Sequence, residues 1–396
     1  MKETNFKHTD IGLIPQDWEL KTLGEIGSFS KGSGISRTDA ATGDIPAVRY
    51  GELYTIHDNL IKEFGSHISK QVATTAKKLT KGDIVFTCSG ETKEDIGKSA
   101  AFLYDCEAYA GGDLIILSPD KDYSPEYLGF TTNSKECKEQ KAARGQGDAV
   151  VHISAREIST IQIPLPPTID EQKRIAEALQ NIDSLIEALD EQIAKKQAIK
   201  TGAMQQLLTA KTRLQGFTGE WKEIVLSKIA TITIGEFVHK NKQNPNGLYP
   251  VYNGGITETG YYDDFNNTAN KIVISARGAA GYINKVERPY WAGNSSYSVG
   301  IINKEFDWIY IYYFMKSKQE TLTENRQQGG GVPAVNKNQI TDFVIFCPPT
   351  LAEQRAIAEV LSNMDAEIQA MQEERNKYAL IKQGMMQELL TGKIRI

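Results

Sequence analysis

The sequence predicts an α+β protein in which two strand-rich α/β domains are separated by two long antiparallel coiled-coil helices, arranged as a dumbbell with pseudo-twofold symmetry. An internal repeat is the main observation behind this prediction. Its first copy occupies 166–214 and its second copy, 182 residues later, occupies 348–396, and roughly half of the aligned positions are identical. Short apolar runs bordered by glycine or proline precede each copy, and such runs are typical of strands.

Each copy of the repeat opens on a Pro-Pro-Thr-x-x-Glu-Gln element and follows a longer segment whose sequence has diverged. These longer segments open on loosely similar stretches around Trp18 and Trp221. The two repeated helical segments are similar while the domains before them have diverged. This suggests that the helical segments dock the same kind of partner and that the two domains recognise different targets. The predicted boundaries are a first variable domain at 1–165, a central helical region at 166–214, a second variable domain at 215–347 and a C-terminal helical region at 348–396.

Two apolar runs in each variable domain predict strands. In chain order these runs are 83–89, 113–118, 271–276 and 297–302. A polar loop containing glycine follows the first strand of each domain, at 89–97 and at 275–281. Because the two loops correspond in position and differ in composition, we expect the two domains to recognise different targets.

Each copy of the repeat also predicts the start of a long helix. The prolines at 166–167 fix an extended approach, after which Thr168 and Glu171 have the spacing of a capping box. The first helix should therefore begin at about residue 169, and Thr350 with Glu353 repeats this signal in the second copy. A helix continuing to the end of the repeat would be on the order of 60 Å long at about 1.5 Å per residue.

Apolar residues in both helices recur at spacings of four and three, which indicates the narrow seam of a coiled coil. Two such seams in one chain most simply pack against each other. Gly202 and Gly384 are expected to end or bend the helices early, and Arg375 interrupts the second seam. The predicted helix–helix seam comprises Ile175, Leu179, Ile182, Ile186, Leu189, Ile193, Ile357, Leu361, Met364, Ile368 and Met371.

The composition favours a cytoplasmic protein of two to three domains. No apolar run approaches the roughly 20 residues of a membrane helix. The formal net charge is −5, and neither variable domain is strongly basic, so charge neither supports nor excludes DNA binding. No Cys-x-x-Cys pair is present, which favours free buried thiols over disulfides or a metal site. The cysteines are Cys88, Cys106, Cys137 and Cys347.

These features together resemble the specificity subunit of type I restriction-modification systems. The resemblance covers essentially the whole chain and rests mainly on the Pro-Pro-Thr-x-x-Glu-Gln element used twice. It is supported by Ile45-Pro-Ala-Val-Arg-Tyr-Gly, by Tyr249-Pro-Val-Tyr-Asn-Gly-Gly and by the terminal Gln-Glu-Leu-Leu-Thr-Gly-Lys. The resemblance implies a non-catalytic, sequence-specific DNA-binding subunit in which each target recognition domain reads one half of an asymmetric bipartite site.

The same resemblance implies that the helices act as a spacer and dock two DNA methyltransferase subunits, which restriction subunits join in the full complex. The chain itself would bind no cofactor and no metal. S-adenosylmethionine, ATP and Mg would be used by the partner subunits, which carry adenine-N6 methylation and ATP-dependent cleavage. No membrane is expected among the partners.

Ten residues near polar or glycine-rich loops are candidates for DNA contact. Arginine can bond guanine through both arms, lysine can contact phosphate, and amide or hydroxyl groups can read base edges. A solvated surface position is the alternative for every one of them, and Arg144 and Arg326 could instead hold each domain on its helix. The candidates are Arg49, Ser89, Thr92, Lys93, Arg144, Gln146, Asn253, Arg277, Arg326 and Gln328.

Two other functions remain open at this stage. Asp83, Glu91 and Lys93 superficially match the acids and lysine of a metal-dependent DNA nuclease. A coiled-coil scaffold without DNA affinity would also explain the helices. Intrinsic methyl transfer is disfavoured because Leu165-Pro-Pro-Thr lacks the polar and aromatic residues that hold a flipped base. A Walker A loop is disfavoured because six residues, not four, separate Gly90 from Gly97.

Overall fold

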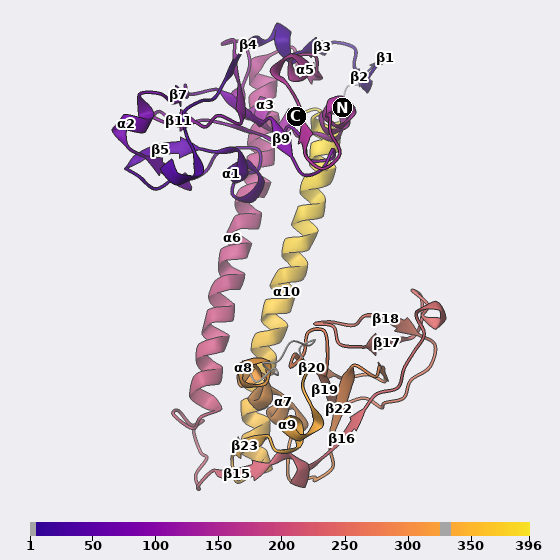
Figure 1. The fold of residues 1–396 in the computed structure, drawn as a ribbon. Helices are drawn as coiled ribbons and strands as arrows, with labels where there is room; N and C mark the ends of the chain where they lie inside the picture. Colours follow the sequence, from indigo (N-terminus) through magenta and orange to yellow (C-terminus); the bar gives the residue numbers. More distant parts are fainter. Residues whose placement is uncertain (1–4, 325–333) are drawn as a thin grey trace. The chain divides into compact units, whose positions relative to one another are not determined.

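The computed structural model describes residues 5–324 and 334–396, and the chain forms two compact units. Unit 1 comprises Met1–Ala188 with Glu374–Ile396, and unit 2 comprises Leu189–Glu373. Two helices of 39 residues, α6 (Ile169–Leu207) and α10 (Leu351–Leu389), each contribute one part to each unit (Figure 1). The predicted mixture of helices and strands and the long repeated helices are therefore confirmed.

The first variable domain, in unit 1, is built on a four-stranded antiparallel sheet in the order β10-β8-β12-β4. Its strands are β4 (Gly27–Lys31), β8 (Ile84–Thr87), β10 (Ser99–Ala101) and β12 (Leu114–Pro119). A second sheet has the order β6-β5-β11-β7, with β5 (Ile45–Val48), β6 (Ser66–Ile68), β7 (Lys77–Lys78) and β11 (Tyr109–Ala110). The helices of this domain are α1 (Tyr50–Thr55), α2 (Lys70–Ala73), α3 (Pro125–Thr131), α4 (Lys135–Arg144) and α5 (Ala155–Ser159).

The second variable domain, in unit 2, repeats this topology. Its main sheet has the order β16-β22-β19-β20, so that β16, β22, β19 and β20 correspond to β4, β12, β8 and β10. These strands are β16 (Ala230–Ile234), β19 (Lys271–Ser275), β20 (Ile283–Val286) and β22 (Ser296–Ile301). The smaller sheet contains β17 (Tyr249–Tyr252), β18 (Gly260–Tyr262) and β21 (Trp291–Ala292), and the helices are α7 (Trp308–Ser317), α8 (Gln319–Glu324) and α9 (Lys337–Thr341). All four strands predicted from the apolar runs are present.

A short two-stranded sheet ties each variable domain to its helix. In unit 1, β3 (Glu19–Thr22) pairs with β14 (Gln162–Leu165), and in unit 2, β15 (Lys222–Val225) pairs with β23 (Val344–Cys347). This pairing places each tryptophan beside the helices. Trp18 is fully buried in one core with Leu179 and other α6 residues, and Trp221 shares a core with Leu361 of α10. Burial of these side chains stabilises the attachment of each domain to its helix.

Within each unit the two long helices run antiparallel. In unit 1, Glu171 contacts Arg395 and Asp183 contacts Lys382, so residue numbers increase along α6 while those of its partners decrease. The corresponding contacts of unit 2 follow the same order. Neither Gly202 nor Gly384 ends its helix, which corrects the expectation of an early end. A single helical glycine costs only about 1 kcal/mol relative to alanine, which the surrounding packing can offset.

The predicted seam residues lie mostly inside. Ile175, Leu179, Ile357 and Leu361 are at most 1% exposed, whereas the middle of each helix is less closely covered. Ile186, Leu189, Ile193 and Ile368 retain 7–9% exposure. Ile182, Met364 and Met371 are half-buried. The tightest packing is therefore found where each helix begins, next to its variable domain.

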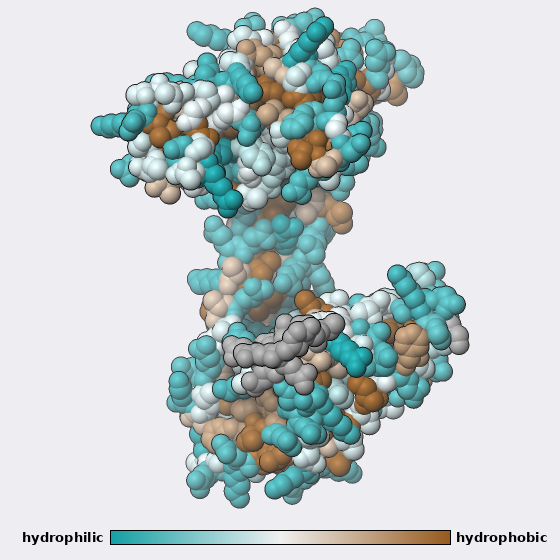
Figure 2. All heavy atoms as spheres, in the orientation of Figure 1, coloured by the Kyte–Doolittle hydropathy of each residue, from teal (hydrophilic) through white to brown (hydrophobic). Residues whose placement is uncertain are grey.

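All four cysteines are free, but only Cys137 and Cys347 are buried. The expectation of four buried thiols was wrong for Cys106, which is exposed because it lies in the bend between β10 and β11, and Cys88 is half-buried. Hydrophilic residues cover most of the visible face in Figure 2. Within 5–324 and 334–396, no helix is long and apolar enough to cross a membrane.

Candidate nucleic-acid interface

The starts of both long helices are held by equivalent arginine–glutamate pairs, which we call the helix-end clasps. Glu171, in the first turn of α6, accepts hydrogen bonds of 2.7 Å from Nε and from Nη2 of Arg395. Glu353, in the first turn of α10, accepts bonds of 2.9 and 2.7 Å from Arg213. The glutamate side chains are 5% and 0% exposed. Bidentate pairs of this kind fix orientation as well as contributing energy.

The clasps explain why the predicted capping boxes are only half formed. Thr168 Oγ1 accepts a 3.2 Å bond from the Glu171 amide, and Thr350 Oγ1 accepts a 3.3 Å bond from the Glu353 amide. The glutamate carboxylates bond to the arginines rather than to the threonine amides, because a guanidinium offers two charge-assisted donors. The helix starts at 169 and 351 agree with the threonine half of the signal.

The glutamine of each Pro-Pro-Thr-x-x-Glu-Gln element attaches a variable domain to its helix. Gln172 Oε1 accepts a 2.9 Å bond from the backbone amide of Ser124, the N-cap residue of α3. Gln354 Oε1 accepts a 2.8 Å bond from the amide of Asp307, the N-cap residue of α7. Both glutamines are at most 3% exposed. A buried amide that lost this partner would be costly, so these bonds fix where each domain sits within its unit.

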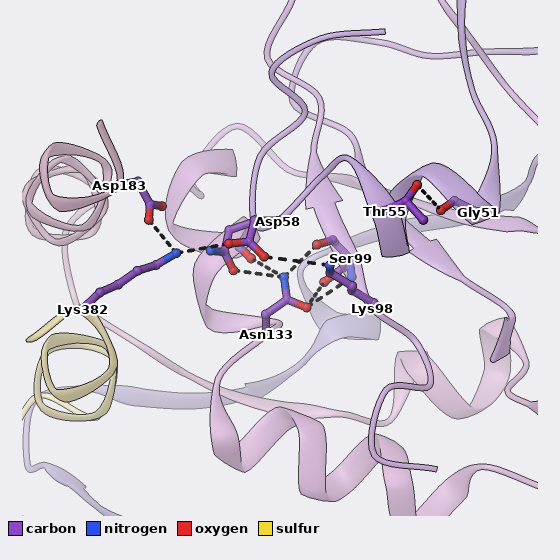
Figure 3. A network of polar contacts seen from close by, with 10 residues as sticks. Gly51, Thr55, Asp58, Lys98, Ser99, Asn133, Asp183 and Lys382 are labelled. Carbon is purple, nitrogen blue, oxygen red and sulfur yellow. Dashed lines mark hydrogen bonds and ion pairs between the residues drawn. The ribbon is translucent and has the colours of Figure 1, made fainter. Parts of the chain in front are cut away.

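A lysine–aspartate pair between the two long helices also occurs in both units, but a different residue of each variable domain contacts it. In unit 1, Lys382 Nζ lies 2.5 Å from Asp183 of α6 and 3.3 Å from Asp58 of the first variable domain (Figure 3). In unit 2, the corresponding Lys200 pairs with Asp365, which accepts a 2.6 Å bond from the hydroxyl of Tyr313. Burial lowers the pKa of Lys382, but its bonds to the two aspartates outweigh burial and raise it overall.

Asp58, whose side chain is 69% exposed, links this contact to Lys98, the residue before β10. Lys98 lies 3.8 Å from Asp58, and the neighbouring Ser99 accepts a 2.7 Å bond at its carbonyl from Asn133 Nδ2 (Figure 3). Asn133 also donates to Asn59 Oδ1 at 3.2 Å. The helix pair is thereby connected through polar side chains to β10, the strand that follows the 89–97 loop.

Two candidates for DNA contact, Ser89 and Gln146, are brought together by a residue that sequence reasoning missed. β9 (Ser89–Gly90) pairs with β13 (Val151–His152), and Ser89 Oγ lies 3.0 Å from His152 Nδ1. The backbone N–H of Gln146 donates a 2.9 Å bond to the His152 carbonyl, while the Gln146 side chain donates to Glu157. His152 and Gln146 are exposed and Ser89 is half-buried, so these polar groups face solvent at one place.

In the second domain, Arg277 and Asn253 also lie close together. Asn253 Oδ1 accepts a 3.0 Å bond from the amide of Ser295, whose carbonyl accepts a 2.8 Å bond from the amide of Ala276. Arg277 is the next residue, is exposed, and forms an isolated bridge with Ala334. Arg326 and Gln328 lie outside the described residues.

One lysine in each domain, buried Lys141 and half-buried Lys316, bonds to the end of the loop after β8 or β19. Lys141 of α4 is 1% exposed and donates to the carbonyls of Gly97 and Thr132 at 2.7 and 2.9 Å. Lys316 of α7 donates to the Ile283 carbonyl at 2.9 Å and lies 3.7 Å from the ring centre of Tyr282. Burial lowers the pKa of each lysine to about 8. The ends of both loops are thus fixed by charge-assisted bonds.

The remaining candidates for DNA contact have other surroundings. Arg49 Nε donates a 2.9 Å bond to Ser66 Oγ, and Arg144 donates to Thr160 Oγ1 and to the Gln140 carbonyl. The Arg144 contacts lie within the first domain and next to α5, and they hold the end of α4. Thr92 and Lys93 are exposed in the loop after β9, and Thr92 Oγ1 bonds to Asp95.

Asp83, the first carboxylate of the nuclease hypothesis, is occupied by the fold. It is 4% exposed, and its oxygens accept a 2.8 Å bond from the Thr80 amide and a 2.6 Å bond from Ser118 Oγ. Burial raises its pKa. Glu91 and Lys93 are exposed instead. These contacts assign Asp83 to the turn before β8 and do not favour the nuclease alternative.

Comparison with known proteins matches most of the chain. Residues 15–199 and 218–378 match a family model described as the type I restriction modification DNA specificity domain. The putative type I restriction enzyme MjaX specificity subunit of Methanocaldococcus jannaschii is 28% identical over 428 residues, covering 100% of this chain and 98% of that protein. The MjaVIII specificity subunit of the same organism is 23% identical over 434 residues, covering 100% and 97%.

A solved structure has the same fold. The crystal structure of the type I restriction-modification S subunit from M. genitalium superposes with a TM-score of 0.70 at 17% identity, covering 98% of this chain and 97% of that one. At this level of identity the match supports the architecture. Both kinds of comparison extend over the two variable domains and the two helices together.

Proposed function

The chain belongs to the family of type I restriction-modification DNA specificity domains, and from this membership we propose that each variable domain, here a target recognition domain, reads one half of an asymmetric bipartite DNA site. The observation that carries the proposal is a repeated framework with unlike loops. Ser89 and Arg277 each follow the equivalent strand by two residues, yet they differ in size, charge and hydrogen-bonding capacity. Two domains with the same fold but different side chains at this equivalent loop position are expected to prefer different bases.

The chain acts in this proposal as a non-catalytic subunit. Adenine-N6 methylation and ATP-dependent cleavage, with S-adenosylmethionine, ATP and Mg, belong to methyltransferase and restriction subunits. The burial of Asp83 supports this division, because the most plausible acid of a nuclease site is engaged in a structural turn. Among the described residues, no group of three or more His, Cys, Asp or Glu side chains is arranged to hold a metal ion.

The helices would provide two equivalent docking surfaces for two methyltransferase subunits, as well as the spacer between half-sites. Several residues that are identical in the two copies of the repeat form the helix-end clasps, the bonds of Gln172 and Gln354, and the lysine–aspartate pairs. Other identical residues are exposed and have no such structural role. Glu177, Asn181 and Ala188 lie on the exposed face of α6 in unit 1, at spacings of four and seven residues that place them on one stripe. Their counterparts in unit 2 are Glu359, Asn363 and Ala370, which are also exposed.

Docking on this stripe can be tested by co-purification with a methyltransferase subunit. The double variant Glu177→Arg/Asn181→Ala should retain one methyltransferase subunit instead of two, because the equivalent stripe on α10 is unchanged. Lys70→Ala is the control, since Lys70 is an exposed residue of α2 in the first variable domain and belongs to neither long helix. Retention of two subunits by the stripe variant would rule out this surface.

DNA recognition can be tested by selecting sequences from a randomised double-stranded library with the purified complex of this chain and a methyltransferase subunit. The proposal predicts enrichment of one asymmetric motif with two specified blocks and an unread spacer of fixed length. A nuclease would instead cleave the library when Mg²⁺ is added to the chain alone. A coiled-coil scaffold would enrich no motif at all.

A further inference from the structure

The two domains present different side chains at one structurally equivalent place. Ser89 lies two residues beyond the end of β8, and Arg277 lies two residues beyond the end of β19, the corresponding strand. Ser89 is opposite His152, and Arg277 is opposite Ala334. His152 and Ala334 are themselves 182 residues apart, so they are the same position of the repeat.

The backbone around this place is held identically in both domains. In the first, the Cys88 amide donates to the Asp113 backbone carbonyl at 3.2 Å, and the Cys88 carbonyl accepts from the Ile153 amide at 3.0 Å. In the second, the Ala276 amide donates to the Ser295 backbone carbonyl at 2.8 Å, and the Ala276 carbonyl accepts from the Val335 amide at 2.9 Å. The residue that follows is therefore presented from an equivalent backbone in each domain.

The helices that follow His152 and Ala334 complete the match. Two residues after His152, Ser154 caps α5 with a capping box to Glu157. Two residues after Ala334, Asn336 caps α9 with a capping box to Gln339. The surrounding hydrogen bonds are thus shared, and the difference between the domains is concentrated in the exposed side chains.

The exposed side chains at this place have different recognition chemistry. Arg277 is exposed, and within the described part of the chain no carboxylate or carbonyl accepts a bond from its guanidinium. A guanidinium in this state can donate two bonds to O6 and N7 of guanine. In the first domain, the Ser89 hydroxyl and the His152 imidazole bond to each other at 3.0 Å and can each donate or accept once more.

We propose that this position determines specificity, with Arg277 reading a guanine in one half-site and the Ser89–His152 pair reading a different base in the other. The inference rests on the proposed function and extends it in two ways. It adds His152 to the recognition residues, and it identifies Arg277 as its domain's counterpart of Ser89. Opposite Arg277 the second domain has the small, apolar Ala334, whereas opposite Ser89 the first domain has His152, a second polar group.

Sequence selection from a randomised library, performed with the methyltransferase complex, tests the proposal. Arg277→Ala should reduce the preference for guanine at one position of one half-site by about 10- to 100-fold. Arg277→Lys keeps the charge but not the rigid planar fork of donors, so it should weaken the same preference less than alanine does and retain overall affinity. Ser89→Ala and His152→Ala should each relax one position of the other half-site and leave the first unchanged.

Arg288→Ala is the matched control, because Arg288 belongs to the same domain but stacks 5.9 Å from the ring centre of Tyr261. It should leave the motif unaltered. If the wild-type complex enriches a bipartite motif and Arg277→Ala and Arg277→Lys enrich the same motif, the proposal is overturned while the proposed function stands. If the wild-type complex enriches no motif, the proposed function itself fails.

Discussion

Replacing Lys382 by methionine should destabilise unit 1 by about 2 to 3 kcal/mol at pH 7. The Lys382 ammonium lies 2.5 Å from Asp183, and the two side chains are only 15% and 13% exposed. Methionine keeps much of the length of the side chain, but it leaves the Asp183 carboxylate poorly hydrated and without its cation. Breaking a fully buried pair in this way costs about 3 to 5 kcal/mol, and the residual hydration of Asp183 lowers the expected loss.

The loss of stability in Lys382→Met cannot exceed the free energy of protonating Asp183, because the protonated carboxyl no longer needs a cation. Protonating at pH 7 a carboxyl whose ordinary pKa is 3.8 costs about 4 kcal/mol, and at pH 5 it costs about 1.6 kcal/mol. Burial already raises the pKa of Asp183 against the opposing effect of Lys382, so removing the lysine raises it further. A group with a raised folded-state pKa loses stability as pH increases, and the destabilisation should therefore shrink from pH 7 to pH 5.

Urea unfolding at both pH values measures this effect, and hydrogen–deuterium exchange of peptides from 374–396 assigns it to unit 1. Lys135→Met is the control, because its partner Glu139 is 3.9 Å away and 68% exposed, and its loss should stay below about 0.5 kcal/mol. Adding Asp183→Asn to the Lys382→Met variant should recover part of the stability. A loss below about 0.5 kcal/mol at pH 7, or an equal loss at both pH values, would refute the reasoning.

Three further predictions concern Lys200, the lysines Lys141 and Lys316, and His57, which is only 3% exposed. Lys200→Met should destabilise unit 2 by less, because Asp365 is 31% exposed and keeps its bond from Tyr313, and the loss should be seen as faster exchange in 351–373 with unchanged exchange in 374–396. Burial lowers the pKa of His57 to about 4, so the folded protein resists protonation that the unfolded chain accepts. Lowering the pH from 6.5 to 4 should therefore reduce the free energy of unfolding of the wild type by up to about 3 kcal/mol. The His57→Leu variant should not show this part of the loss in urea unfolding. Both Lys141 and Lys316 bind fewer protons in the folded state than in the unfolded state, because their pKa values are lowered to about 8. Between pH 8 and 9.5 the free energy of unfolding of the wild type should therefore rise relative to that of the double variant Lys141→Met/Lys316→Met. The same dependence of unfolding free energy on pH in both proteins would contradict this.

Much of the fold could be predicted because its signals are local. The helix starts follow from Pro-Pro-Thr and the strands from short apolar runs, and both depend on residues near one another in the chain. The clasp between Glu171 and Arg395 is different, because its partners are far apart in sequence. Both residues are identical positions of the repeat, so the repeat marked them as important, but only the antiparallel packing determines which of them meet.

The candidate site was harder to predict from sequence. His152 was missed because its counterpart Ala334 shares no chemistry with it, so comparing the two copies gave no signal there. Arg144 was a reasonable candidate on charge and position, yet its donors are directed to Thr160 and to a backbone carbonyl. A surface arginine can bond to its own domain or to DNA, and the sequence alone contains no information about which it does.

The most direct test of the central claim is a map of N6-methyladenine in the genome of a host that lacks adenine methylation. The chain is co-expressed with a matching methyltransferase subunit, and single-molecule sequencing locates the methylated sites. Our account predicts one asymmetric bipartite motif that appears only when this chain is present. No motif, despite a soluble complex of both proteins, or a single continuous motif would contradict the assignment of one half-site to each domain.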